Sequence, residues 1–223
     1  MSEAFGLLLG GDGETWFIIW TSLRFSFFST LFALVLALPV GLALALGHFP
    51  GRRALVSLVN ALQALPTVVI GLLIYALISR SGPLGFLGML YEGPGVILGQ
   101  AVLGFPIVAS LVAAGLQRLD PRFAETLVTH GAGRWRRIEL TLRESRGILV
   151  AAVVTAFGRV TGEVGVSMML GGNIRGSTRT MTTAIALDTA KGEFERALGL
   201  GIALLVIALA VNLAIHALVR HEN

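Results

Sequence analysis

The sequence has no cysteine and few charged residues, and these two absences restrict the kind of protein that it can encode. Without cysteine, the chain forms no disulfide bond, holds no metal through thiolates and has no cysteine nucleophile. Only 13% of its 223 residues are charged, about half the share in a typical globular protein, whereas 55% are hydrophobic. This is too little charge to cover a soluble domain, and disorder requires the opposite composition. We therefore expect a protein embedded in a lipid bilayer.

Patterns that mark other functions are also missing. No Lys/Arg-rich run is interleaved with aromatic residues, so the net charge of +4 does not indicate nucleic-acid binding. The chain lacks a Gly-x-x-x-x-Gly-Lys-Ser/Thr loop and is therefore not an ATPase. No metal site is predicted, because the four histidines are scattered over different segments: His48, His130, His216 and His221.

Five stretches are long and apolar enough to cross a bilayer as helices, which takes about 20 residues each. They are placed at approximately 16–46, 56–78, 96–117, 147–170 and 197–219. The predicted fold is an all-α polytopic membrane protein, with residues 16–219 forming a single transmembrane domain. Gly93-Pro94-Gly95 is predicted to be a turn before the third span, and Pro66 is a place where the second span can kink.

The predicted loops differ in their content of Lys and Arg, which indicates orientation because cytoplasmic loops retain positive charge. Loop 118–146 alone contains seven arginines. With the N-terminus outside, ten basic loop and tail residues lie inside and five lie outside. We therefore predict that segment 1–15 is external, loop 118–146 is cytoplasmic and tail 220–223 is cytoplasmic. Segment 1–15 has no Lys or Arg, which excludes the basic region of a cleaved signal peptide.

Loop 118–146 is predicted to contain two short amphipathic helices. Asp120-Pro121 supplies an N-cap acceptor and a proline in the first helical turn. Gly131 can end this helix in the left-handed conformation, and a second helix starts near Arg134. Each helix has one apolar and one charged face. Such helices suit either anionic lipid headgroups at the membrane surface or a cytoplasmic protein partner.

The same loop resembles the EAA loop of ABC importer permeases, whose pattern is Glu-Ala-Ala-x-x-x-Gly followed by Ile-x-Leu-Pro. The Glu-to-Gly interval matches, whereas Thr126 and Leu127 replace the alanines and Arg143 stands where the proline is expected. The residues expected to couple to an ATPase are Ala124, Glu125, Leu127, Gly131, Ala132, Gly133, Arg134 and Trp135.

Two further stretches resemble permeases for molybdate, tungstate and sulfate. They are Gly162–Ile174 with Thr178–Ile185, and Leu65–Leu72 in the second span. Arg143 after Leu142, together with Met181–Ile185, is most similar to the tungstate permeases.

The resemblance implies a non-catalytic subunit of a prokaryotic plasma (inner) membrane importer. Two copies of the chain would enclose a translocation path, an ABC ATPase subunit would dock on each cytoplasmic loop, and a periplasmic or lipid-anchored oxyanion-binding protein would approach from outside. The resemblance also implies that ATP and Mg²⁺ bind the ATPase and that this chain binds no cofactor itself. Membrane lipid is the remaining partner.

Charged residues in and near the fourth span have two interpretations each. Arg159 and Glu163 lie four residues apart on one helix face, where they either brace the path near its external gate or form an ion pair that locks helix packing. Asn173, Arg175 and Arg179 are expected at the external gate, where they either guide an oxyanion or belong to a solvated loop. Asp188 and its charged neighbours are expected on a polar external surface.

Other function classes remain as alternatives. The substrate can be molybdate or sulfate instead of tungstate, by the same mechanism. A stand-alone secondary transporter or channel would require inverted repeats or buried acidic relays, but the sequence has one intramembrane acid and no repeat. An intramembrane enzyme is disfavoured because no catalytic pairing of side chains lies at depth.

Overall fold

The computed structural model describes residues 13–220, apart from the side chains of Pro121, Ala124, Glu125 and residues 214–220. Within this part of the chain every regular element is a helix, as predicted. The helices, in chain order, are α2 (Gly13–Leu46), α3 (Arg52–Leu62), α4 (Thr67–Ile78), the 3-10 turn η1 (Gly85–Leu87), α5 (Gly93–Leu116), α6 (Pro121–Thr129), α7 (Arg134–Glu144), α8 (Arg146–Thr161), α9 (Gly165–Gly171), α10 (Met181–Lys191) and α11 (Phe194–Arg220).

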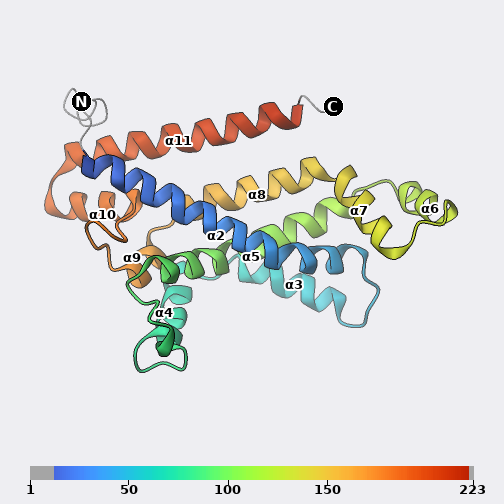
Figure 1. Cartoon of the computed structure of the whole chain (residues 1–223), viewed down its shortest axis with the longest axis horizontal. Helices are drawn as coiled ribbons and strands as arrows, with labels where there is room; N and C mark the ends of the chain where they lie inside the picture. Colours follow the sequence, from blue (N-terminus) through green and yellow to red (C-terminus); the bar gives the residue numbers. More distant parts are fainter. Residues whose placement is uncertain (1–12, 221–223) are drawn as a thin grey trace.

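The long helices form an elongated bundle around α5, and α2, α8 and α11 run along its length (Figure 1). The contact between α2 and α5 is the most extensive one between two helices. Small residues bring the helices close together: a Cβ atom at Gly41 would lie 2.8 Å from the side chain of Val112, and one at Gly115 would lie 2.2 Å from Ile148. Close contacts of this kind hold membrane helices together, because apolar burial between helices gains little in lipid.

Three of the five predicted spans are confirmed as single continuous helices. α2, α5 and α11 are each long and apolar enough to cross a membrane, and their ends lie within three residues of the predicted ones. The predicted turn at Gly93–Gly95 is wrong. These residues form the first turn of α5, where Pro94 lacks only an N–H that has no partner within the helix.

The other two predicted spans are broken helices. α3 and α4 are bent by 99° at their junction, and α8 and α9 are bent by 63°. At the first break Pro66 is extended, with φ −60° and ψ 125°, because a proline and its preceding residue resist a continuous helix. At the second break a side chain replaces helical bonding: Glu163 Oε1 accepts hydrogen bonds from the N–H groups of Gly165 at 2.9 Å and Val166 at 3.4 Å.

α10 was not predicted. Its eleven residues are too few to span a bilayer, and its threonines gave no helix signal. A reciprocal capping box between Thr180 and Thr183 starts the helix, which packs against α2 and α11. Asp188 is consequently only 3% exposed, so its prediction as part of a polar external surface is wrong.

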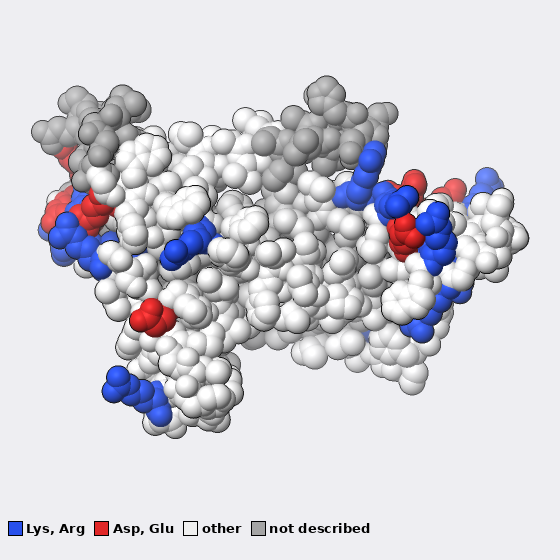
Figure 2. Space-filling view, viewed as in Figure 1, with Lys and Arg blue, Asp and Glu red and all other residues white. Residues whose placement is uncertain are grey.

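The charged side chains on the face drawn in Figure 2 gather mainly at the two ends of the bundle, and the middle is mostly uncharged. One end carries α6 and α7, and the other carries α10 and the start of α2 (Figure 1). This distribution fits a bundle whose long axis crosses a bilayer.

Candidate functional site

The loop at residues 118–146, hereafter the coupling loop, forms the two predicted helices. Asp120 Oδ1 accepts a hydrogen bond from Arg122 N at 2.9 Å, which starts α6. Gly131 follows α6 with φ +70°, a conformation that glycine adopts without strain. Gly133 then precedes the first turn of α7. The predicted helix starts and the glycine stop are confirmed.

The coupling loop presents large apolar side chains to its surroundings. Trp135 is 82% exposed and Val128 is 57% exposed. Of the other predicted coupling residues, Leu127 and Ala132 are half-buried, and Gly131, Gly133 and Arg134 are exposed. Ala124 and Glu125 lie on α6, but their side chains fall outside the described part of the structure. The role of these residues in coupling stays a prediction.

Ion pairs along α7 stabilise its polar face. Glu139 contacts Arg136 Nη1 at 2.7 Å and Arg143 Nη2 at 2.8 Å, one helical turn away on either side. The hydrogen bond from Arg136, assisted by the charges of both arginines, lowers the pKa of the Glu139 carboxyl. Thus the charges of Arg136, Glu139 and Arg143 lie in one row along α7.

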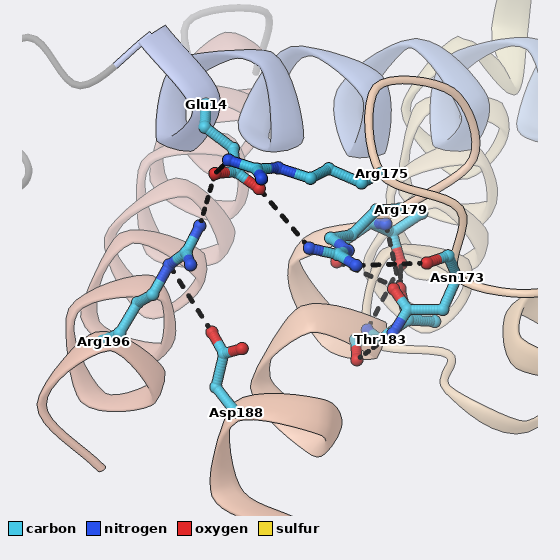
Figure 3. Close-up of polar contacts among 8 residues, drawn as sticks. Glu14, Asn173, Arg175, Arg179, Thr183, Asp188 and Arg196 are labelled. Atoms are coloured by element: carbon cyan, nitrogen blue, oxygen red, sulfur yellow. Dashed lines mark hydrogen bonds and ion pairs between the residues drawn. The ribbon is translucent and has the colours of Figure 1, made fainter. Parts of the chain in front are cut away.

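At the opposite end of the bundle, five charged side chains from four segments converge, as Figure 3 shows. Glu14 of α2 contacts Arg175 Nη2 at 2.5 Å, Arg196 Nη2 at 3.1 Å and Arg179 Nη1 at 3.4 Å. Arg196 Nε also lies 3.7 Å from Asp188 Oδ2 of α10. Three guanidinium groups therefore surround two carboxylates, and this group, called the external cluster after the side on which the sequence predicts it, retains a positive excess.

The predicted gate residues lie in this cluster or beside it, in an ordered loop. Asn173 has φ +52°, and its Nδ2 donates to the carbonyl of Thr183 at 3.3 Å. Arg179 Nη2 donates to the carbonyl of Asn173 at 3.4 Å (Figure 3). Arg175 remains 73% exposed, whereas Arg179 is only 14% exposed. The loop is thus held by side-chain hydrogen bonds, and its part in gating stays a prediction.

The sequence reasoning missed Glu14, Arg196 and the burial of Asp188. Glu14 and Arg196 each stand at the start of an expected span, so the predicted topology already placed both at the same end of the bundle. Which arginine pairs with which acid depends on the packing of α10 between α2 and α11. Burial raises the pKa of the Asp188 carboxyl, and the charge of Arg196 opposes this shift.

Arg159 and Glu163 are in direct contact within the bent pair α8–α9. Arg159 Nη1 donates to Glu163 Oε2 at 2.7 Å. Glu163 is 5% exposed and Arg159 is 47% exposed. No other helix of the described chain approaches closely at Gly158 and Gly162, since a Cβ atom at Gly158 would meet nothing within 4 Å and one at Gly162 only carbonyls of its own helix.

The sequence pattern of one protein family matches most of this chain. Residues 37–222 match the family described as binding-protein-dependent transport system inner membrane component. The chain belongs to this family. It is therefore a multi-pass inner membrane protein and a permease component of a transport system, and the predicted resemblance to importer permeases is confirmed.

Permeases of oxyanion uptake systems are among the similar relatives. The chain is 35% identical to the tungstate uptake system permease protein TupB of Peptoclostridium acidaminophilum over 215 residues, which cover 96% of this chain and 94% of that protein. It is 38% identical to TupB of Campylobacter jejuni over 173 residues, which cover 78% of this chain and 72% of that protein. It is 31% identical to the molybdenum transport system permease protein ModB of Escherichia coli K12, covering 88% and 91%.

Solved transporter structures share the fold. The inward-facing MetNI methionine ABC transporter superposes with a TM-score of 0.78 at 19% identity, covering 95% of this chain and 99% of that chain. A bacterial alginate ABC transporter, solved in complex with an alginate pentasaccharide-bound periplasmic protein, has a TM-score of 0.73 at 20% identity and covers 97% and 82%. The chain therefore shares its fold with solved ABC transporter structures.

Proposed function

We propose that this permease carries tungstate through the membrane in an ATP-driven importer. The observation that carries the proposal is the 35% identity to a tungstate permease across 96% of the chain. Molybdate is the second candidate, because the 31% identity to a molybdenum permease also extends over 88% of the chain. Sulfate is the third candidate, since the chain is also 30% identical to the sulfate permease CysT of Escherichia coli K12.

In this proposal the external cluster faces outward and the coupling loop faces the cytoplasm. The support is the positive charge of loop 118–146, since basic loops are retained inside. The structure adds a geometric reason, because the loop and the external cluster lie at opposite ends of the bundle (Figure 1). An external binding protein would then deliver its anion next to Arg175 and Arg179, where the positive excess attracts it.

The coupling loop is the proposed docking element for an ABC ATPase, with one ATPase on each of two copies of the permease. Trp135 supports this role, because large exposed aromatic side chains anchor protein interfaces, and the exposed Val128 adds apolar surface to the same loop. ATP and Mg²⁺ would bind the ATPase, whose movement would reach the spans through α6 and α7 as a rigid-body displacement. The permease would contribute no catalytic residue.

Competition uptake tests the substrate. The permease is reconstituted in liposomes with its ATPase and binding protein, and labelled tungstate uptake is measured with unlabelled molybdate or sulfate in excess. Tungstate uptake that resists a tenfold excess of both competitors supports the proposal. If an excess of sulfate or molybdate abolishes tungstate uptake, that anion becomes the proposed substrate in place of tungstate.

Co-purification tests the docking. Trp135→Ala removes an 82% exposed side chain from the coupling loop, and Phe86→Ala removes an equally exposed one from the turn η1. The Trp135 variant is expected to lose most of the bound ATPase, and the Phe86 control to retain it. Equal retention by both variants contradicts docking through the coupling loop.

A further inference from the structure

α8 exposes a stripe of residues whose composition differs from that of the exposed faces of α2 and α11. Exposed residues that are small or charged recur there at helical spacing and continue to the residue after the helix, with Val150 beside them at 36% exposure: Ala151, Thr155, Gly158, Arg159 and Gly162. We call them the α8 stripe. The exposed face of α2 carries Phe27, Phe28 and Leu31 instead, and that of α11 carries leucines such as Leu209. Bulky apolar faces suit lipid tails, whereas the α8 stripe does not.

The guanidinium of Arg159 lies deep along the span. Arg159 comes thirteen residues after Arg146, where α8 begins, which is about 20 Å along the helix axis. An arginine at this depth faces protein or water and not lipid. Its 47% exposure therefore marks a surface that the bilayer does not cover.

The two partners of the ion pair differ in burial and in how many of their polar atoms are hydrogen-bonded. Both oxygens of Glu163 are engaged, one by Arg159 and the other by the N–H groups of Gly165 and Val166. Glu163 is buried at 5% exposure, so it acts as a cap for α9. A guanidinium has five N–H donors, and the contact with Glu163 occupies one nitrogen of Arg159, so donors remain on its exposed side.

The break between α3 and α4 lies beside the same ion pair. A Cβ atom at Gly165 would lie 3.2 Å from Thr67 Oγ1 and 3.3 Å from Glu163 Oε1, so the two broken spans meet next to the ion pair. Residues 63–66, which connect α3 to α4, are exposed and non-helical. Irregular backbone at membrane depth is tolerated only inside protein or along a water-filled cavity.

We propose that the α8 stripe lines an aqueous path and that Arg159 contacts the oxyanion inside the membrane, while Glu163 only positions it. This proposal rests on the proposed oxyanion transport and assigns one contact residue within it. A tetrahedral oxyanion accepts two parallel hydrogen bonds from a guanidinium, which matches the exposed donors of Arg159. The glycines at 158 and 162 leave space beside the guanidinium for the anion.

Cysteine labelling tests the aqueous path without relying on transport. Because the chain has no cysteine, Thr155→Cys and the control Leu209→Cys each introduce a unique thiol in the assembled complex. Small anionic and cationic thiosulfonates are then compared. The thiol at 155 is expected to react, with the anionic reagent about tenfold faster than the cationic one, and the thiol at 209 to stay unreacted.

The charge of Arg159 is tested in the same background. Adding Arg159→Gln to Thr155→Cys is expected to remove most of the preference for the anionic reagent, an effect that a purely structural role of Arg159 does not produce. An unreactive thiol at 155, or an unchanged reagent preference after Arg159→Gln, overturns the proposal.

Uptake separates contact from positioning. Arg159→Gln is expected to lower tungstate transported per ATP hydrolysed about tenfold, Arg159→Lys to restore part of it, and Glu163→Gln to cause a smaller loss because its amide oxygen still caps α9. Equal losses for Glu163→Gln and Arg159→Gln overturn the assignment of the contact to Arg159. If the wild-type complex imports another oxyanion, the tungstate proposal fails, and the labelling still decides the role of Arg159.

Discussion

Neutralising Glu14 should loosen the end of the bundle opposite the coupling loop, because one carboxylate contacts three arginines from two other segments. We consider Glu14→Gln, which keeps the size of the side chain and one acceptor oxygen. The pair with Arg175 is the shortest, at 2.5 Å, but Arg175 is 73% exposed. Solvent screening limits such a pair to about 0.2–1 kcal/mol.

The pair with Arg196 contributes more, although its 3.1 Å distance is longer. Arg196 is 28% exposed and Glu14 is 19% exposed, and a hydrogen bond between charged groups shielded in this way contributes about 1.5–3 kcal/mol. Arg179 is better shielded still, at 14% exposure, but its 3.4 Å contact is weak. With one acceptor retained, we expect Glu14→Gln to lower the free energy of unfolding by about 2 kcal/mol. For a chain of this length that corresponds to a Tm decrease of about 4–8 °C.

Thermal unfolding of the purified complex, followed by tryptophan fluorescence, measures this effect. Glu92→Gln is the matched control, because it neutralises an exposed acid at the start of α5. A double-mutant cycle then compares the coupling of Glu14 with Arg196 and with Arg175. An unchanged Tm for Glu14→Gln, or a stronger coupling to Arg175 than to Arg196, would refute the reasoning that burial outweighs distance here.

Three further predictions concern other parts of the chain. Gly131→Ala, at φ +70°, should lower the free energy of unfolding by about 1 kcal/mol and reduce ATPase coupling. Gly133→Ala, at φ −62°, should leave both nearly unchanged. Unfolding experiments and ATP-driven uptake measure the two effects. Burial raises the pKa of Asp188, so its ionised form destabilises the fold above that pKa and the cost disappears as the pH falls towards the ordinary value of about 3.9. Asp188→Asn should therefore raise Tm at neutral pH and lose this advantage in acid, and a Tm gain independent of pH would contradict this. Gln100 joins two buried serines of α2 and α9 at 3.0 and 3.1 Å, so Gln100→Leu should lower the unfolding free energy by about 1–3 kcal/mol, whereas Gln117→Leu at an exposed site should have little effect.

Local sequence signals were enough for the continuous spans and the coupling loop. The ends of α2, α5 and α11 follow from apolar length, and the start of α6 follows from Asp120 accepting a backbone N–H next to a proline. These features depend on residues a few positions apart. The family resemblance was likewise carried by short contiguous stretches.

The broken spans could not be predicted in the same way. Residues 56–78 and 147–170 are mostly apolar, and neither stretch contains a polar segment long enough to indicate the bends of 99° and 63°. At the second break the carboxylate of Glu163 replaces helical hydrogen bonds, and Thr182 Oγ1 donates to the Glu163 carbonyl at 2.9 Å. That second contact comes from α10, which the sequence analysis did not anticipate.

The sequence by itself determined the solvent, the apolar segments and the family, because hydropathy and charge in each segment act almost independently of the other segments. Only the tertiary structure decided which charges are buried, which are paired and which remain open. Arg159 and Glu163 have the same spacing in either interpretation, yet packing buries one and exposes the other. Glu14 meets its arginines across about 160 residues for the same reason, since electrostatic partners are chosen by proximity in space and not along the chain.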